Sequence, residues 1–378
     1  MYSGMTPTIA IFLGSFGGGG IEGAFANLAH GLIQKGLIVD LVLSQVVSEE
    51  HLKRLPPETR IINLKAPKLY RSLPRLVGYL REKKPVAMLS ASHYTNEIAV
   101  LAKQLSGVST RVVVCEQNQF SIKVANGTKL KHRLMPFFAK HFYPRADGIV
   151  AVSGGVADDL AQMTGISRER IQVIYNPVLT PEVLEKSKKP LDHPWFNPGE
   201  PPVILGVGKL QAQKDFPTLI RAFAEVQKVQ SARLMILGWG PDKPQLEALI
   251  RDLDLENDVE LAGFQKNPHA YMAQSKVFVL SSAWEGLGNV LIEAMAAGSP
   301  VVSTDCPSGP AEILDNGKYG FLTPVGDSKA LAEAILKTLS GESKKHDPAW
   351  LEQFTLDNVI RQYIDIFGLQ KYITPVPL

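Results

Sequence analysis

Cysteine is scarce in this chain, and long apolar runs are missing. Only Cys115 and Cys306 occur among 378 residues, which excludes a disulfide framework and a zinc site built from cysteines. No apolar run approaches the roughly 18 residues of a membrane-spanning helix. The segment Met1–Ala10 also lacks the basic start and long apolar core of a signal peptide. We therefore expect a cytoplasmic protein with reduced thiols, whose contact with membranes is at most peripheral.

An excess of charge of either sign is also missing. The chain has 40 Lys+Arg against 37 Asp+Glu, a formal charge of +3, and so small an excess gives no reason to expect a nucleic-acid partner. Hydrophobic residues make up 45% and charged residues 20%, as in ordinary globular proteins. At roughly 150 residues per domain, the length predicts two or three domains.

Short apolar runs rich in β-branched residues alternate with helical patterns along most of the chain. Runs of this kind are typical of strands buried on both faces of a parallel sheet, and the alternation predicts an α/β fold. The predicted strands are 9–13, 38–43, 87–90, 111–115, 148–152 and 172–174, then 203–207, 233–237, 259–261, 277–280 and 300–303. The clearest predicted helices are 23–35, 216–229, 244–252, 289–297 and 356–367.

The pattern is interrupted once, over residues 180–202, which are rich in proline and charge and which we interpret as a linker. We therefore predict two doubly wound, Rossmann-like domains, 1–180 and 198–352, with parallel sheets facing a central cleft. The last segment, 353–378, is predicted to pack back on the first domain. Ligands of such sheets bind beyond the carboxyl ends of the strands, so the loops there should carry the chemistry.

A glycine loop follows the first predicted strand. Gly18, Gly20 and Gly23 satisfy the pattern G-x-G-x-x-G, and Asp40 lies 17 residues further on. This arrangement would suit a dinucleotide and an NAD(P)-dependent oxidoreductase. The run Gly17–Gly20 also fits a phosphate, a sugar or a plain flexible turn, so the loop alone does not choose between them.

Two lysines flank the loop after predicted strand 203–207. Lys209 follows Gly208, and Lys214 lies just before the next helix. Ammonium groups at a strand end can neutralise a diphosphate, although lysines in loops are more often simply solvated.

A second glycine loop follows predicted strand 277–280 and carries two glutamates. Glu285 is in the loop, where it could accept hydrogen bonds from sugar hydroxyls. Glu293 is one turn into the helix, within the apolar segment VLIEAMAA, where a carboxylate is costly unless it is hydrogen-bonded. A ribose diol could donate to it, and the free amides of 288–290 could face an anion. The alternative places Glu285 in solvent and Glu293 on a backbone amide.

These segments resemble those of a known enzyme family. The spacing of Glu285 and Glu293 resembles the E-x7-E signature of the retaining glycosyltransferases of family 4, which have the GT-B fold. The sequence of 208–215 resembles that family's G-R-L-x-x-x-K segment, and 308–313 resembles its G-G-P-A-E-I loop. Smaller similarities occur at the first glycine loop, Ser153, 176–177 and 238–240, so the likeness runs from about residue 8 to 367.

The resemblance implies a transfer of sugar from a nucleotide-sugar, with retention, to a hydroxyl of a glycan or lipid-linked acceptor in cell-surface polysaccharide or glycoconjugate synthesis. Catalytic roles would fall to Glu285, which holds the donor sugar, and to Lys209 and Lys214 at the diphosphate. Further donor contacts would come from Glu293, Gly286, Leu287, Gly288, Asn289, Gly208, Gly18 and Gly19. The donor, by family frequency a UDP-sugar, is a substrate, so no cofactor and no metal ion are expected. A non-catalytic sugar-nucleotide-binding subunit remains an alternative.

The chain departs from the family at two places. Lys209 stands where arginine is common, and keeps the charge without the bidentate fork. The loop after the fourth strand reads Glu116, Gln117, Asn118 where many members have a histidine. These residues and His93 are candidates for acceptor or sugar contacts, against a plain loop and a structural histidine. Asp252-Leu-Asp254 is a D-x-D sequence in a charged segment, which we interpret as a solvated helix end.

Basic and aromatic residues interleave over 129–145 and 71–84 in the first domain. Such helices could rest on anionic headgroups of the inner membrane leaflet, which would suit a lipid-linked acceptor. The alternative is a solvated helix face whose apolar side packs on the sheet.

Overall fold

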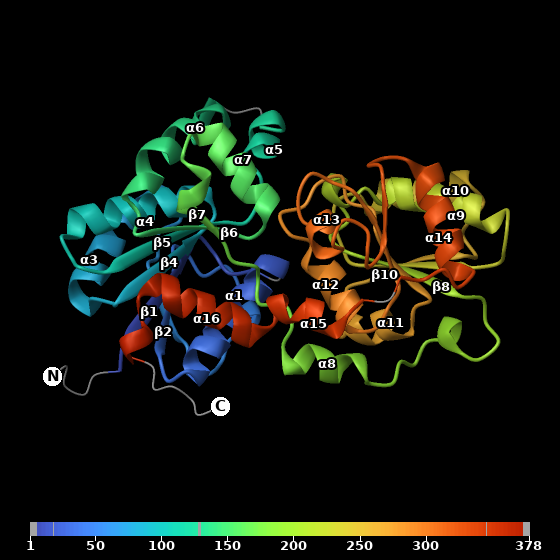
Figure 1. Ribbon diagram of the computed structural model, residues 1–378, viewed down its shortest axis with the longest axis horizontal. Helices are drawn as coiled ribbons and strands as arrows, with labels where there is room; N and C mark the ends of the chain where they lie inside the picture. Colours follow the sequence, from blue (N-terminus) through green and yellow to red (C-terminus); the bar gives the residue numbers. More distant parts are fainter. Residues whose placement is uncertain (1–5, 18, 128–129, 345, 373–378) are drawn as a thin grey trace. The chain divides into compact units, whose positions relative to one another are not determined.

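The computed structural model describes residues 6–17, 19–127, 130–344 and 346–372, with backbone alone for Leu130, Lys131 and Lys371. The chain forms two compact units (Figure 1). The first comprises Met1–Pro177 and Gln353–Leu378, and the second comprises Val178–Glu352. The second unit is therefore one continuous stretch of chain, inserted between two parts of the first.

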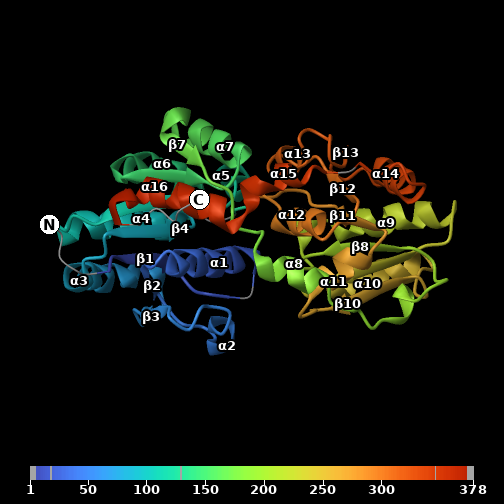
Figure 2. The ribbon, with the colours of Figure 1, turned by 60° about the horizontal axis from the view of Figure 1, so that its bottom comes forward.

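The first unit has a parallel sheet in the order β3-β2-β1-β4-β5-β6-β7. In Figure 2 the labelled strands of this sheet follow one another upwards in the order β3, β2, β1, β4 and β7. Apolar side chains at 5% exposure or less fill β1 from Ile9 onward, as expected for a strand covered on both faces. The strands are β1 (Thr8–Leu13), β2 (Ile38–Leu43), β3 (Arg60–Asn63), β4 (Ala87–Ala91), β5 (Arg111–Glu116), β6 (Gly148–Ala151) and β7 (Ile171–Val173).

Helices of the first unit connect these strands, and one more returns from the end of the chain. They are α1 (Gly20–Gln34), α2 (Glu49–Leu52), α3 (Leu73–Lys83), α4 (His93–Ser106), α5 (Phe120–Ala125), α6 (Leu130–Phe142), α7 (Gly154–Thr164) and α16 (Leu356–Phe367). Short 3₁₀ turns occur at η1 (Leu69–Ser72), η2 (Tyr143–Arg145), η3 (Arg168–Arg170) and η7 (Gln370–Tyr372).

Helix α16 buries one apolar stripe at helical spacing, from Leu356 through Ile360 to Phe367. It packs beside α1, where Gly31 leaves room for the Ile360 side chain: a Cβ on Gly31 would lie 2.5 Å from Ile360 Cγ1. Arg111 Nε on β5 donates a hydrogen bond to Ile366 O at 2.6 Å. The C-terminal helix is thus part of the core of the first unit.

The second unit has a parallel sheet in the order β10-β9-β8-β11-β12-β13. Its strands are β8 (Val203–Val207), β9 (Arg233–Leu237), β10 (Val259–Gly263), β11 (Val277–Leu280), β12 (Val301–Thr304) and β13 (Phe321–Thr323). Its helices are α8 (Pro181–Ser187), α9 (Phe216–Gln227), α10 (Lys243–Asp252), α11 (Pro268–Gln274), α12 (Asn289–Ala296), α13 (Pro310–Ile313), α14 (Ser328–Leu339) and α15 (Pro348–Leu351), with 3₁₀ turns η4 (Pro194–Phe196), η5 (Ala212–Lys214) and η6 (Glu352–Phe354).

The α/β class and the parallel sheets are confirmed, but three details differ from the sequence-based prediction. Strands β3 and β13, both at sheet edges, were not predicted. The segment 180–202 contains α8, whose first turn is capped by Thr180 Oγ1, the acceptor for Val183 N at 3.4 Å, and which packs on α11. Helix α1 begins at Gly20, earlier than predicted, so the first glycine loop is shorter.

The strand order fixes where ligand chemistry can gather. In each sheet the order reverses once, between β1 and β4 in the first unit and between β8 and β11 in the second. Loops that follow such neighbouring strands leave the same edge of the sheet and turn to opposite faces, which opens a crevice.

Within the described ranges, none of the helices is long and apolar enough to span a membrane.

Candidate active site

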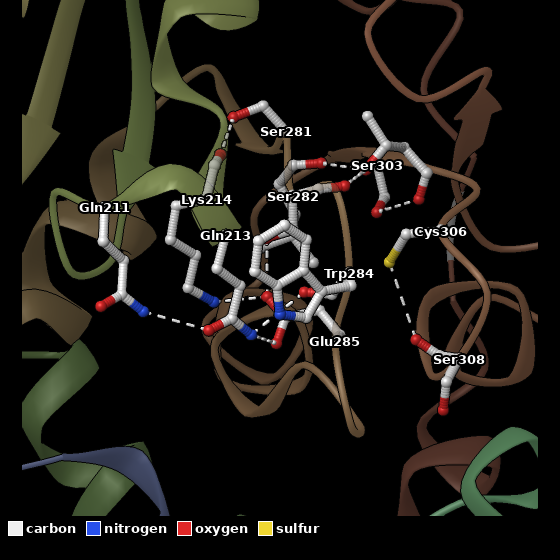
Figure 3. Close-up of polar contacts among 12 residues, drawn as sticks. Gln211, Gln213, Lys214, Ser281, Ser282, Trp284, Glu285, Ser303, Cys306 and Ser308 are labelled. Carbon is white, nitrogen blue, oxygen red and sulfur yellow. Dashed lines mark hydrogen bonds and ion pairs between the residues drawn. The ribbon is translucent and has the colours of Figure 1, made fainter. Parts of the chain in front are cut away.

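Two loops of the second unit are tied together at the carboxyl ends of β8 and β11. Ala283 N donates to Gln213 O at 2.8 Å, and Ser281 Oγ donates to Lys214 O at 2.8 Å (Figure 3). The loop after β8 is therefore held against the loop after β11 by one bond between backbone atoms and one from a serine hydroxyl to a backbone carbonyl. The side chains that follow are fixed by this pairing.

Lys214 and Glu285 form a largely buried ion pair between these loops (Figure 3). Their side chains are 14% and 8% exposed. Ser282 Oγ donates to the same carboxylate oxygen at 2.6 Å, and Gln213 Nε2 lies 3.5 Å from the other and 3.0 Å from Trp284 O. The alternative in which Glu285 lies in solvent is wrong.

Glycines shape the loop between Glu285 and α12. Gly288 precedes the first helical residue with φ +96°, a conformation that glycine adopts without strain. Gly309, with φ +93°, lies so close that a Cβ there would be 1.9 Å from Leu287 O. Ser308 Oγ donates to Gly286 O at 2.8 Å. The loop after β12 thus holds the glycine loop in one conformation.

Lys209 lies apart from Lys214, on the exposed side of its loop. Leu210 N donates to Trp239 O at 3.0 Å, and Gly238, with φ +143°, is so close that a Cβ would be 1.8 Å from Gly208 O. Lys209 Nζ lies 5.3 Å from the centroid of the exposed Trp239 ring. An exposed ammonium group here can reach an anion at low desolvation cost.

Glu293 is in α12, and its carboxylate faces a neighbouring helix. Its Oε2 lies 3.3 Å from His269 Nε2 on α11, and its side chain is 23% exposed. The structure therefore brings Lys214 and Glu285 into contact, while Lys209 and Glu293 have other neighbours. No pattern in the sequence indicates His269 as a neighbour of Glu293.

Cys306 lies near this site as a protonated thiol. Burial, and next the negative charge of Glu285, raise the pKa of Cys306 to about 12. Its Sγ lies 3.7 Å from Ser308 O, to which it donates. A thiol in this state is no nucleophile at neutral pH.

A second group of the predicted residues lines a small pocket in the first unit. The pocket, of about 30 Å³, lies where β4 and β5 end. That volume is about that of one water molecule or one hydroxyl group. It is lined by Ser92, His93, Glu116, Gln117, Asn118, Gln119, Phe120, Lys123 and Met135. All four candidates for acceptor or sugar contacts are among them.

Glu116 is the buried acid of this pocket. Its Oε1 accepts hydrogen bonds from Tyr143 Oη and from Asn96 Nδ2, the latter at 3.0 Å. Burial raises the pKa of Glu116 to about 7, against the opposing effect of these bonds and of the Lys123 charge. The carboxyl group therefore exchanges a proton near neutral pH.

His93 is the first residue of α4 and is 1% exposed. Burial, and next the charge of Lys123, lower the pKa of His93 to about 3. Its Nε2 lies 3.3 Å from Glu97 Oε1. Burial, with the neighbouring Glu116, raises the pKa of Glu97 to about 8. The imidazole is thus neutral at pH 7.

The amide residues of the pocket differ in hydrogen bonding and exposure. Gln117 is held at both ends: Nε2 donates to Cys115 Sγ at 3.2 Å, and Oε1 accepts from Asn176 Nδ2 at 3.3 Å. Asn118 is exposed. Gln117 can therefore present a fixed edge, while Asn118 can adapt to a ligand.

In this structure, the acidic residue that the dinucleotide alternative needs for the ribose is not free to bind it. Asp40 is fully buried within β2, where its carboxylate accepts from Arg60 Nε at 2.5 Å and Tyr79 Oη at 2.7 Å. Gly19 precedes α1, and a Cβ there would lie 2.8 Å from Glu22 Oε2. Gly18 lies outside the described residues.

The two basic and aromatic segments differ in what they expose. On α6, Phe137, Leu134 and Phe138 are 56%, 40% and 38% exposed. In 71–84, the Tyr79 side chain is buried, and its Oη donates a hydrogen bond to Asp40. Lys129, which begins the first segment, lies outside the described residues, as does the side chain of Lys131.

No group of three or more His, Cys, Asp or Glu in the described part of the chain could hold a metal ion. Asp252 ends α10 and Asp254 follows it, both exposed. The interpretation of the D-x-D sequence as a solvated helix end is confirmed.

Comparison with known proteins bears on both units. The family model described as Glycosyltransferase Family 4 matches residues 18–180, and the model described as Glycosyl transferases group 1 matches residues 187–349. A Campylobacter jejuni protein is 31% identical over 89% of this chain and 91% of its own length. It is named N-acetylgalactosamine-N,N'-diacetylbacillosaminyl-diphospho-undecaprenol 4-alpha-N-acetylgalactosaminyltransferase. The lipopolysaccharide core biosynthesis glycosyltransferase LpsE of Rhizobium meliloti is 34% identical over 53% of this chain and 56% of its own length.

Solved structures share the fold. Anabaena HepE in complex with UDP-glucose superposes with a TM-score of 0.77 at 19% identity, covering 96% of this chain and 99% of that chain. The lipopolysaccharide outer core galactosyltransferase WaaB, in its apo form, gives 0.71 at 22% identity, with 96% and 99% covered. The GT-B fold predicted from the sequence is confirmed. The family models and the relatives together establish that this chain is a glycosyltransferase and belongs to glycosyltransferase family 4.

Proposed function

We propose that this glycosyltransferase uses a UDP-sugar and transfers the sugar, with retention and without a metal ion, to a hydroxyl of a lipid-linked glycan. The product would enter a cell-surface polysaccharide or glycoconjugate. Support for the donor comes from structural neighbours solved with UDP or UDP-glucose. Support for the acceptor comes from the C. jejuni relative, whose name contains a diphospho-undecaprenol sugar.

The observation that carries this proposal is the buried Lys214–Glu285 pair at the β8–β11 crevice. Lys214, with Lys209 at the exposed edge, would neutralise the pyrophosphate as it leaves, and Glu285 would hold the donor sugar. Glu293 and the backbone of 286–289 would complete the donor site. The ammonium and amide groups are fixed before the substrate arrives, so they stabilise developing charge with little reorganisation.

The reaction we infer is a front-face displacement. The acceptor hydroxyl forms the new glycosidic bond on the side where the bond to the diphosphate breaks. Its proton passes to an oxygen of the leaving phosphate, so UDP leaves with the proton and the anomeric configuration is kept. The protein contributes position and charge stabilisation. The pocket around Glu116 and His93 would receive a hydroxyl of the acceptor or of the donor sugar.

A thermal-shift panel tests the donor, because a ligand that binds only the folded state raises the melting temperature. At about 100 times Kd the expected gain is roughly 2.7 kcal/mol. We expect UDP-sugars to stabilise the protein and GDP-sugars, ADP-sugars and NAD(P) not to. Stabilisation by NAD(P) alone would restore the oxidoreductase alternative.

A transfer assay with a lipid-linked acceptor tests the chemistry. The anomeric coupling constant of the product, measured by NMR, separates retention from inversion, and activity in EDTA tests independence of metal. Donor binding without transfer or donor hydrolysis, on several acceptors, would instead favour the non-catalytic subunit.

We also propose that the exposed face of α6 docks on anionic lipid at the inner membrane leaflet. Exposed phenylalanines beside exposed Arg133 and Lys140 provide apolar and cationic groups together. Flotation with phosphatidylglycerol vesicles should show binding that falls in a Phe137→Ser, Phe138→Ser variant. Val229→Ser, at a still more exposed apolar residue of the second unit, is the control. Absence of binding by the unmodified protein would remove this proposal.

A further inference from the structure

The carboxylate of Glu293 has a neighbour that belongs to a different helix. His269 is the second residue of α11, and its side chain is 11% exposed. Its Nε2 lies 3.3 Å from Glu293 Oε2 on α12. Helices α11 and α12 pack on each other, and Ser299 Oγ, just after α12, donates to Met272 O on α11. The two side chains are therefore held together by two packed elements.

Neither ring nitrogen of His269 makes a hydrogen bond to the described part of the chain. Burying an imidazole removes its hydrogen bonds to water, and this free-energy cost is offset only if the ring makes hydrogen bonds within the protein or to a ligand. The Glu293 carboxylate oxygen is within reach of Nε2, and a neutral imidazole carrying its proton there is a donor. The two atoms lie 3.3 Å apart, within hydrogen-bond distance. In a histidine, the hydrogen bond that one ring nitrogen makes determines which of the two nitrogens carries the proton.

The exposure of Glu293 shows where its other oxygen can act. At 23% exposed, the Glu293 side chain is neither fully buried between the helices nor free in solvent. One oxygen faces His269, so an open edge is left for a ligand. The same helix begins at Asn289, directly after the glycine loop that carries Glu285.

We propose that His269 is a positioning residue for Glu293: it donates from Nε2 to Oε2 and so directs Oε1 at a ribose hydroxyl of the nucleotide. This inference depends on the donor site proposed above. His269 itself touches no substrate and acts only through Glu293. A residue that merely joins two helices would affect stability without affecting the recognition of ribose.

The test compares the binding of UDP and 2′-deoxy-UDP by calorimetry. The unmodified protein should prefer UDP by about tenfold, since each 1.4 kcal/mol changes Kd tenfold and hydrogen bonds to charged groups are of that size. Glu293→Gln should lose most of this preference. His269→Leu should lose it as well, and the combined variant should lose no more than either alone. His269→Gln, whose amide Nε2 can replace the ring donor, should keep most of it.

The chain offers a matched control. His193 Nε2 lies 3.2 Å from Glu260 Oε2, also in the second unit, with exposures of 18% and 40%. His193→Leu should leave the preference for UDP unchanged. In transfer assays, His269→Leu should raise the donor KM several-fold and change kcat less than twofold. Melting curves establish that each variant is folded at the temperature of the titration.

Two results would overturn the inference. One is a folded His269→Leu variant that prefers UDP over 2′-deoxy-UDP as the unmodified protein does, while Glu293→Gln has lost that preference. The other is a loss in His269→Leu that His269→Gln does not restore. Should the unmodified protein bind no uridine nucleotide at all, the proposed donor itself would be wrong, and this result is separate from the other two.

Discussion

The substitution Glu285→Gln should change donor binding and catalysis in opposite directions. It removes the carboxylate charge beside Lys214 and keeps the shape of the side chain. If Lys214 must serve the pyrophosphate, Glu285 competes with that anion for the ammonium group. We therefore expect the variant to bind UDP more tightly and to transfer sugar more slowly.

The size of the effect follows from burial. Two unit charges about 4 Å apart attract by roughly 4 kcal/mol at an effective dielectric constant of 20. With side chains 14% and 8% exposed, this pair is screened less than a surface pair. Hydrogen bonds from Ser282 and Gln213 hold the carboxylate in either case. Taking a third of that attraction as the net competition gives about 1.4 kcal/mol, or about tenfold in the Kd of UDP.

Calorimetry with UDP measures the first effect and initial rates of transfer measure the second. The loss of kcat should be about 10²–10³-fold, the usual effect of removing one group that acts on the transition state. Ser282→Ala keeps the charge and should show no gain in affinity. In a Lys214→Met background, Glu285→Gln should bring no gain either. A folded Glu285→Gln protein that binds UDP no more tightly than the unmodified enzyme would refute the reasoning.

Three further predictions concern other residues. Gly238→Ala or Gly309→Ala should lower the free energy of unfolding, measured by urea titration, by at least about 3 kcal/mol, because each Cβ would overlap a carbonyl oxygen and each φ is positive. The control is Gly298→Ala, where φ is also positive but the Cβ would lie in open space. This change should cost only about 1 kcal/mol in the same titration. Lys209→Ala should raise the donor KM several-fold in a rate assay and leave the melting temperature within about 2 °C, since this side chain is exposed; an unchanged KM would exclude it from the donor site. The folded state keeps a proton on Glu116 up to a pKa of about 7, against an ordinary value of 4.5, so the contribution of the protonated Glu116 to stability should be full below pH 4.5 and lost as pH rises through 7. Glu116→Gln should abolish that part of the pH dependence in urea titrations between pH 5 and 8. A variant with the same pH profile as the unmodified protein would contradict the raised pKa of Glu116.

The central strands could be predicted because a strand covered on both faces is apolar throughout. The edge strands β3 and β13 could not, although the edge strands β7 and β10 could. In β3 the side chains are exposed or half-buried along its length, and β13 has only three residues. Neither supplies the apolar run that marks a buried strand. By contrast, α8 did leave a signal, since Thr180 followed by Pro181 is a common helix start. Proline and charge in that segment concealed it.

The candidate site could be predicted where it follows from chain order in a parallel sheet. Lys214 and Glu285 come after neighbouring strands, so their meeting was foreseeable. His269 and Tyr143 were not foreseeable, since each reaches its glutamate from an element whose packing the local sequence does not specify. Lone histidines and tyrosines in helical segments have no spacing that indicates a partner.

The position of α16 has a consequence for how the chain matures. The first unit is completed by residues made after the whole of Val178–Glu352. Until then the surface of α1 around Gly31 stays uncovered, whereas the inserted unit can fold as soon as its own stretch emerges. Nascent chains that end before Leu356, held to the ribosome by a linker long enough to clear the tunnel, should therefore resist proteolysis in the inserted stretch and be digested in the earlier part.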